Sequence, residues 1–278
     1  MVNRMILGGL TALAVVLAGC GSGEQTTTFS VEQRFAKAKA LFDNSDYLEA
    51  INEFTVITLQ FQGSQFAGDA QYYLGECRYG RREYLLAAFE YGVLKRSYPA
   101  SPRVPDGQYK LAMSYYRLSP GSSLDQQYTK KAIDEFQSFI EYYPSHQLAA
   151  DVDAKIRELN TKLARKLYDA ARQYLILERY KAAMRYFDDV IEKYHDTEYA
   201  PLAYLDKVEV LIDRRRYLEA RDELSRFMTR YPNSVFRRRA DQLQQRLQEE
   251  GKEWKNAPAA SSAVTAPLSS DQTAGRVK

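Results

Sequence analysis

The apolar positions of this chain form a helical stripe that occurs five times. Each copy starts at a small residue, and large apolar residues follow four, seven and eleven positions later. The starting residues, called the anchors below, are Ala50, Ala87, Ala132, Ala183 and Ala220. Offsets of 0, 4, 7 and 11 lie on one face of an α-helix. The pattern therefore predicts five amphipathic helices of one kind.

The residues that break the stripe recur in the same register. Twelve positions after the anchors, three copies carry proline, which cannot continue a helix. Fourteen positions after them, four copies carry Ser or Thr, which favours a cap on the next helix. Those four are Ser64, Ser101, Thr197 and Ser234. Twenty positions after the anchors, four copies have Ala or Gly, which lets neighbouring helices approach closely. Each copy therefore predicts a helix, a turn and a second helix.

The anchors are spaced by 37, 45, 51 and 37 residues, close to the roughly 34 residues of a tetratricopeptide repeat. The 45-residue step contains Ser119-Pro120-Gly121-Ser122-Ser123, which is typical of a loop. The 51-residue step runs from Ala149 to Glu178 without Pro or Gly, which predicts a long connecting helix. We therefore expect an all-α, right-handed tetratricopeptide solenoid of about five helix-turn-helix repeats. Repeats one to three are expected within 31–148, and repeats four and five within 149–248.

The two ends of the chain differ from this pattern. Arg4 precedes the short apolar stretch Ile6 to Leu17, and Leu17-Ala18-Gly19-Cys20 resembles a bacterial lipobox. We interpret 1–19 as a lipoprotein signal peptide, with a plain secretion signal as the alternative. Cys20 would carry diacylglycerol and an N-acyl chain, and several acyl chains anchor a protein stably. Residues 20–30 are expected to be a flexible tether and 249–278 a disordered tail.

Composition and motifs narrow the classes of function. A net charge of +3, without a basic–aromatic motif, gives no support for nucleic-acid binding. The two histidines, His146 and His195, occupy repeat junctions, which indicates turn residues. No nucleophile, metal-ligand or phosphate-loop motif occurs, so we expect no enzyme, no metal and no cofactor besides the lipid. Cys77 lies on an apolar face and is expected in the core.

Several local sequences resemble one family of tetratricopeptide lipoproteins. Tyr73-Leu74-Gly75-Glu76-Cys77-Arg78-Tyr79 is followed by Tyr84-Leu85-Leu86-Ala87-Ala88 and by the junction Tyr98-Pro99-Ala100-Ser101-Pro102. More specific are Leu118-Ser119-Pro120, Leu124-Asp125-Gln126 and the helix start after them. Together with the lipobox, these resemble the BamD family, the lipoprotein subunit of the machine that assembles outer-membrane β-barrels. The resemblance covers Cys20 to about Gln248.

This resemblance implies a location and two kinds of partner. The chain would be lipid-anchored on the periplasmic side of the outer membrane. Its C-terminal repeats would bind the periplasmic domains of a BamA-type barrel subunit, and its N-terminal repeats the C-terminal strand of unfolded outer-membrane proteins. The alternative is another periplasmic repeat adaptor, for cell-envelope constriction or peptidoglycan coordination. A carbohydrate-binding lipoprotein is disfavoured, because Trp254 is the one tryptophan.

Aromatic and cationic residues supply the candidate binding sites. An extended peptide can be held by Tyr and Arg side chains in a groove of the repeats. The groove candidates are Tyr47, Tyr72, Tyr79, Arg81, Arg82 and Tyr109. The candidates for the barrel-subunit contact are Arg185, Arg214, Arg215 and Arg216. Packing between repeats is the alternative role for the tyrosines, and a solvated helix face is that for the arginines. A third basic run, Arg237 to Arg239, opposes the dipole of its helix, so it either binds an anion or is solvated.

Overall fold

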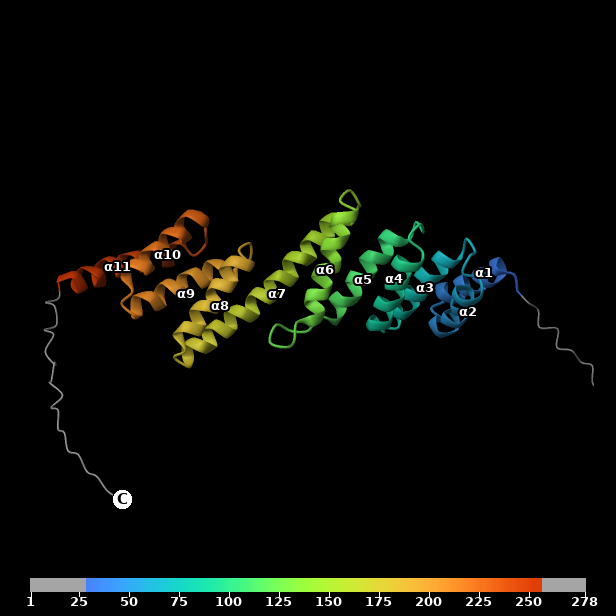
Figure 1. Ribbon diagram of the computed structural model, residues 1–278, viewed down its shortest axis with the longest axis horizontal. Helices are drawn as coiled ribbons and strands as arrows, with labels where there is room; N and C mark the ends of the chain where they lie inside the picture. Colours follow the sequence, from blue (N-terminus) through green and yellow to red (C-terminus); the bar gives the residue numbers. More distant parts are fainter. Residues whose placement is uncertain (1–28, 257–278) are drawn as a thin grey trace, which may run out of the picture. The chain divides into compact units, whose positions relative to one another are not determined.

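The computed structural model describes residues 29–256, with the side chains of 253–256 excepted. Within this range the chain forms eleven α-helices and no strand (Figure 1). The contacts divide it into two compact units, one ending at Val104 and the other beginning at Pro105. The first unit contains α1 (Val31–Asp43), α2 (Tyr47–Gln60), α3 (Ala67–Gly80) and α4 (Tyr84–Ser97).

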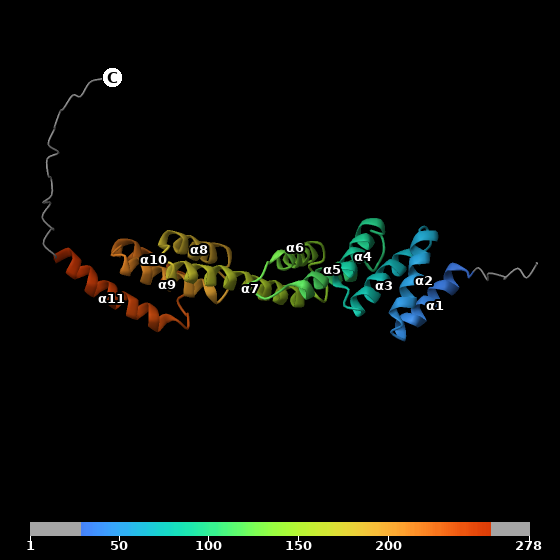
Figure 2. The same cartoon turned by 90° about the horizontal axis from the view of Figure 1, so that it is seen from below.

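The second unit holds the remaining seven helices. They are α5 (Val104–Leu118), α6 (Gln127–Tyr142), α7 (Ala149–Ile176), α8 (Tyr180–Lys193), α9 (Tyr199–Asp213), α10 (Tyr217–Arg230) and α11 (Arg237–Asn256). Within each unit, a helix packs mainly on its neighbours in the sequence (Figure 2). This is the contact pattern of a helical repeat array, in which each repeat touches only adjacent ones. The expected all-α tetratricopeptide architecture is confirmed.

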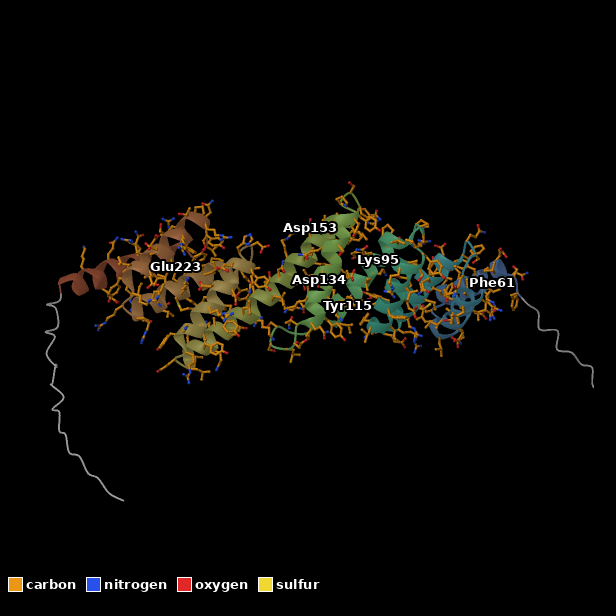
Figure 3. All side chains as sticks on the ribbon, viewed as in Figure 1. Phe61, Lys95, Tyr115, Asp134, Asp153 and Glu223 are labelled. Atoms are coloured by element: carbon orange, nitrogen blue, oxygen red, sulfur yellow. The ribbon has the colours of Figure 1, made fainter. Side chains whose placement is uncertain are left out.

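The predicted stripe forms the core. All five anchors are completely buried, and so are Phe54, Tyr91, Phe136 and Phe187 four positions later. The stripe is one position shorter than expected, because the residue at offset eleven ends each helix. Phe61 is such a C-cap residue, half-buried with φ of −128° and ψ of 40° (Figure 3). These five C-cap aromatics close the ends of the core.

The hydroxyl residues do not cap the helices as the sequence indicated. The N-cap residues of α3, α7 and α9 are Phe66, Leu148 and Glu198, and none makes a side-chain cap hydrogen bond. Ser101 instead stabilises the turn before the helix, where its Oγ accepts a hydrogen bond from the Arg103 backbone N–H at 3.2 Å. Ser234 accepts in the same way from Phe236. The helices therefore begin three residues after Ser101 and Ser234, at Val104 and Arg237.

In four repeats the helix that precedes the anchor helix ends in a left-handed turn without glycine; these helices are α1, α3, α7 and α9. Ser45, Arg82, Glu178 and Arg215 have φ between 56° and 65°, and all stand five positions before an anchor. The residue that follows each one donates its N–H to a carbonyl five residues back, as Arg216 does to Leu211 at 2.8 Å. This is the Schellman arrangement that satisfies free carbonyls at a helix end.

The loop predicted in the 45-residue step and the long helix predicted in the 51-residue step are both present. Ser119 to Ser123 forms a loop between α5 and α6. Buried Gln126 holds it, because its Nε2 donates to the carbonyls of Gly121 at 2.8 Å and Leu124 at 3.0 Å. The long helix α7 packs on α6 and on α8, so it joins repeats three and four within one unit. The sequence-based division between 148 and 149 therefore falls inside the second unit.

The ends of the chain lie partly outside the described residues. The signal peptide 1–19, Cys20 and most of the tether 20–30 are among residues that the structure does not describe; Ser30 caps α1. Residues 249–256, assigned to the tail from sequence, are helical because α11 continues to Asn256. An ion pair between Arg246 and Glu250, one turn apart, supports this extension. No helix within 29–256 is long and apolar enough to cross a membrane.

Candidate protein-binding surfaces

Four of the six groove candidates gather around the end of α3. Tyr79 lies on its last turn, with its ring edge-on to Tyr84 at 5.1 Å, and Arg81 and Arg82 form the turn into α4. Tyr47 reaches the same place from α2. A Cβ on Gly80 would lie 2.7 Å from the Tyr47 ring, so glycine is required for this close approach.

The cations in this cluster differ in their partners. Arg81 Nε donates to Glu83 Oε1 at 2.8 Å, and Arg78 Nη1 donates to Glu83 Oε2 at the same distance. The hydrogen bond from Arg78 is the main reason that the pKa of Glu83 is lowered; burial acts in the opposite direction, and the hydrogen bond from Arg81 adds to the lowering. Among the described residues, Arg82 is exposed and has no ion pair. Arg82 is therefore the cation of this cluster most available to a ligand.

Tyr72 and Tyr109 lie elsewhere. Tyr72 is two turns earlier on α3, where the guanidinium of Arg103 stands 5.4 Å above its ring. Tyr109 belongs to the second unit, and its hydroxyl donates to Asp151 on α7 at 2.9 Å while its ring packs on Phe136. Sequence reasoning missed Arg103, which also pairs with Asp69 at 3.3 Å. No local motif identifies such a contact, since Asp69 and Arg103 are 34 positions apart.

Three of the four candidate partner-binding arginines line two separate hollows in the second unit. Arg185 lines a pocket of about 890 Å³ at the start of α8, together with Arg179, Tyr180, Lys181, Tyr186 and Asp189. Arg214 extends from the α9–α10 turn and places its guanidinium 4.7 Å above the Tyr180 ring. Arg185 and Arg214 are both exposed and, within 29–256, have no ion pair.

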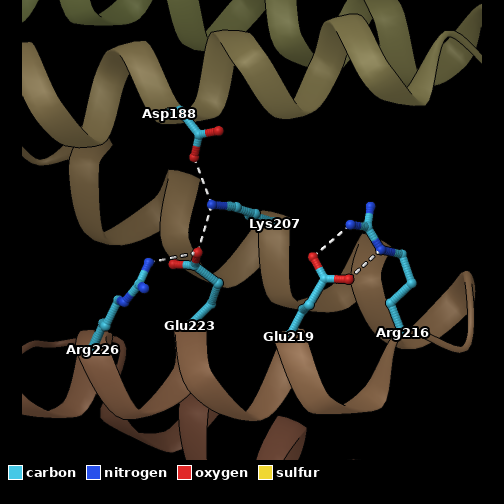
Figure 4. A network of polar contacts seen from close by, with 6 residues as sticks. All are labelled: Asp188, Lys207, Arg216, Glu219, Glu223 and Arg226. Atoms are coloured by element: carbon cyan, nitrogen blue, oxygen red, sulfur yellow. Dashed lines mark hydrogen bonds and ion pairs between the residues drawn. The ribbon is translucent and has the colours of Figure 1, made fainter.

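Arg215 and Arg216 belong to the second hollow, a groove of about 800 Å³ between α10 and α11. Its apolar lining comes from Leu218, Leu224, Met228 and Leu247. Arg216 is already engaged, because its guanidinium makes two hydrogen bonds to the carboxylate of Glu219, at 2.7 and 2.5 Å (Figure 4). The basic run is thus divided between two surfaces.

Other charges in this unit serve its own stability. Lys207 Nζ lies 2.5 Å from Asp188 Oδ1 and 2.7 Å from Glu223 Oε1, which joins α8, α9 and α10 (Figure 4). Burial acts to lower the pKa of Lys207, but the two carboxylates outweigh it and raise that pKa. Arg239, from the third basic run, pairs with Asp206 and Glu209 at 2.6 Å each. This intramolecular pairing offsets the unfavourable helix dipole, so Arg239 needs no external anion.

The described residues show no arrangement for metal chemistry. No group of three or more His, Cys, Asp or Glu side chains within 29–256 is placed to hold a metal ion. His146 packs edge-on against Phe139, and His195 offers its carbonyl to the Tyr231 hydroxyl at 2.7 Å. Both histidines are turn residues, as predicted. Cys77 is fully buried, and burial raises the pKa of its thiol to about 12.

Five helix pairs in a common register, completed by α11, define a tetratricopeptide-type helical repeat protein. The profile of the YfiO family, described as outer membrane lipoprotein, matches residues 28–211, so the chain belongs to this family. Its relatives include the outer membrane protein assembly factor BamD of Rickettsia prowazekii, 27% identical over 231 residues, covering 82% of this chain and 92% of the relative. BamD of Neisseria gonorrhoeae is 24% identical over 246 residues, covering 78% and 91%.

Solved tetratricopeptide domains are similar to this chain as well. The tetratricopeptide domain of P58(IPK) is similar with a TM-score of 0.40 and 15% identity, covering 81% of this chain and 57% of that one. The TPR2AB domain of yeast Sti1 gives 0.37 and 14%, covering 78% and 98%. The assignment of the fold rests on the helix pairs and their register.

Proposed function

We propose that this protein is an outer-membrane protein assembly factor that binds two kinds of protein. Its second unit binds the periplasmic domains of a BamA-type barrel subunit, and its first unit receives unfolded outer-membrane proteins. Family membership and relatives named as assembly factors support this role. The observation that carries the site is the pocket lined by Tyr180 and Arg185, beside which Arg214 lies over the Tyr180 ring; neither arginine has an ion pair within 29–256.

The chemistry of this pocket favours a carboxylate-bearing partner. Unpaired arginines beside an aromatic ring can bind an acidic side chain with two hydrogen bonds while the ring packs against its aliphatic part. Because Arg185 and Arg214 come from different repeats, only the folded array presents both. An acidic residue on a periplasmic domain of the barrel subunit would fit between them.

The first unit offers a site for an extended peptide with an aromatic end. Tyr47, Tyr79 and Arg82 stand at the α2–α3–α4 corner, where two half-buried rings lie near an exposed cation. Anchoring by acyl chains on Cys20 would keep both sites on the periplasmic side of the outer membrane. Replacement of Cys20 by Ser should then move the chain from the membrane to the soluble fraction.

Co-purification from gently solubilised membranes tests the main proposal. The Arg185→Glu, Arg214→Glu double variant should lose a stoichiometric outer-membrane barrel subunit that the parent chain retains. Arg165→Glu, Arg230→Glu is the matched control, because both side chains are exposed in the same unit and neither lines the pocket. This control variant should retain the barrel subunit. Recovery of division or peptidoglycan proteins without the barrel subunit would favour the general adaptor instead.

A photo-crosslinking experiment tests the peptide site separately. A crosslinker at position 79 should label a peptide that ends in an outer-membrane protein's aromatic C-terminal strand. The same group at Tyr174, which is stacked on Tyr186 in the second unit, is the control. Equal labelling at both positions would contradict a specific site in the first unit.

A further inference from the structure

The exposed face of α4 is apolar at positions where α6 and α10 carry mostly charged residues. Leu85, Leu86 and Phe89 are 53%, 45% and 60% exposed, and Val93 beside them is half-buried. These residues lie within about one third of the helix circumference, at 100° per residue. They form an apolar stripe over the first three turns of α4 that the other helices of the first unit leave exposed. It is called the α4 stripe below.

The repeat register provides an internal comparison. Two positions before, one before, two after and six after the anchor, α4 has Leu85, Leu86, Phe89 and Val93. The corresponding residues of α6 are Lys130, Lys131, Asp134 and Ser138, and those of α10 are Leu218, Glu219, Asp222 and Arg226. Asp134, the counterpart of Phe89, is labelled on α6 in Figure 3. The shared fold therefore does not require an apolar face here, and burial of the repeat core does not explain it.

Two cations mark the ends of the α4 stripe. Arg82 stands in the turn before the helix and Arg96 on its last turn, both exposed. Within residues 29–256 neither has an ion pair, whereas Arg78 and Arg81 nearby share Glu83. At 1.5 Å per residue, Arg82 and Arg96 are separated by roughly 20 Å along the helix. A ligand that covers the stripe therefore meets a positive charge at each end.

We propose that the α4 stripe is a docking surface for an amphipathic helix of another protein, with acidic residues near both ends. Its apolar residues cover Leu85, Leu86 and Phe89, and its carboxylates pair with Arg82 and Arg96. Helices of this kind are recognised through anchors spaced three and four residues apart. This surface shares Arg82 with the corner at Tyr47, whereas Leu85, Leu86, Phe89 and Arg96 belong to neither site of the proposed function. Variants at Phe89 and Arg96 therefore test the α4 stripe separately.

The positions of Arg82 and Arg96 also favour this partner over a second copy of the chain or a membrane surface. Two copies of the chain would face each other with arginine against arginine in either helix orientation, and such pairs repel. A helix that lies in a membrane interface carries Lys and Arg along its whole polar face. Here, on the stripe itself, the unpaired cations stand only at its two ends. A helix of matching length with acidic ends fits this distribution best.

Peptide binding measured by fluorescence anisotropy tests the proposal. Two synthetic helical peptides share one apolar face, and one carries Glu at both ends while the other carries Lys. The protein is the full chain from residue 20 with Cys20→Ser, which requires no detergent. The Glu-ended peptide should bind at least roughly tenfold more tightly than the Lys-ended one, about 1.4 kcal/mol. Arg96→Glu should reverse or abolish that preference.

Two variants distinguish binding at the α4 stripe from non-specific hydrophobic binding. Phe89→Asp should weaken binding of the Glu-ended peptide by at least roughly tenfold. Ile176→Asp is the matched control, because Ile176 is more exposed, at 75%, and lies at the end of α7. Circular dichroism must show that both variants remain folded.

Three outcomes would overturn the proposal. The first is equal binding of the two peptides, and the second is an equal loss in both variants. The third is binding of neither peptide while the protein sediments with anionic phosphatidylglycerol vesicles through Phe89, which would assign the stripe to a membrane surface.

Discussion

Replacement of Gly75 by Ala tests how tightly α3 and α4 pack. Gly75 is buried on α3, and a Cβ there would lie 2.4 Å from Cε1 and 2.7 Å from Cδ1 of Tyr91. Carbon atoms prefer about 3.5–4.0 Å. Tyr91 cannot easily withdraw, because it is fully buried and its hydroxyl donates to Glu76 Oε1 at 2.6 Å. The methyl group must therefore displace a ring that is held at both its face and its tip.

The expected magnitude follows from two opposed terms. Gly to Ala inside a helix ordinarily stabilises by about 1 kcal/mol, while overpacking a core costs about 1–3 kcal/mol. With a contact this short we expect the upper end of that cost, and thus a net loss of about 2 kcal/mol. For a chain of this size such a loss lowers the melting temperature by roughly 4–8 °C.

Urea and thermal unfolding, followed by circular dichroism, measure the effect. Gly92→Ala on α4 is the matched control, since its Cβ would meet only the flexible end of Arg96 at 3.2 Å, and it should be neutral or stabilising. In a Tyr91→Phe background the ring no longer has a hydroxyl that binds Glu76. In the preceding repeat, Ala38 and Phe54 occupy the positions of Gly75 and Tyr91 and are both fully buried, so an Ala–Phe pair fits these positions. Gly75→Ala should then cost at least about 1 kcal/mol less. An unchanged cost, or stabilisation by Gly75→Ala alone, would refute the reasoning.

Four further changes have defined outcomes. Lys207→Met should lower the free energy of unfolding by about 2–4 kcal/mol in urea titrations, because it leaves Glu223 buried without its main partner; a loss below that of an exposed ion pair would contradict this. Cys77 should resist a thiol reagent until the chain is unfolded, since its pKa is raised to about 12; modification of the native protein at the unfolded rate would be inconsistent with its burial. Arg215→Val should destabilise by about 1–2 kcal/mol relative to Arg215→Gly, because a β-branched residue is strained at φ of 56°; equal stabilities would show that the turn relaxes. Burial acts to raise the pKa of Glu53, but Lys37 and Arg34 outweigh it and lower that pKa. The contribution of Glu53 to the free energy of unfolding should therefore vanish as the pH falls from about 4.5 through the lowered pKa. Glu53→Gln should remove this part of the acid dependence, and an unaltered profile of stability against pH would disprove it.

The buried register could be predicted from sequence because it is local and repeated. A small anchor with large residues four and seven positions later leaves one helix face to bury, and five copies make coincidence implausible. The same reasoning located the loop at Ser119 and the long helix α7. Both depend on residue types with strong local preferences, Pro and Gly in the loop and their absence in the helix.

Helix ends were harder to predict, because the usual signals are missing or have another use. Glycine commonly marks a left-handed helix end, yet Arg82 and Arg215 occupy that conformation here. Hydroxyl residues commonly mark a helix start, yet Ser101 and Ser234 stabilise the turn before it. The backbone of Arg82 and Arg215 thus reaches a positive φ without glycine, and the hydroxyl groups of Ser101 and Ser234 bind within the turn and not at the helix start.

The binding surfaces were predicted only in part, because their geometry comes from contacts between repeats. Sequence identified Arg214 to Arg216 as one basic run, but Arg214 lies over Tyr180 and Arg216 is held by Glu219. Whether an arginine is available to a partner depends on carboxylates that lie on other turns and other helices. No pattern along one segment contains that information.

The five repeats nevertheless show where function can be encoded. Positions that face the core are constrained to small and apolar residues in every copy, so they cannot distinguish one repeat from another. Binding specificity must therefore lie where sister positions differ. Phe89 with Asp134, and Arg185 with Asp222, are such pairs: each occupies the second position after an anchor. A substitution that exchanges Arg185 for the aspartate of its sister repeat should consequently impair binding while leaving the unfolding transition unchanged, and a loss of stability of the same size as the loss of binding would contradict this separation.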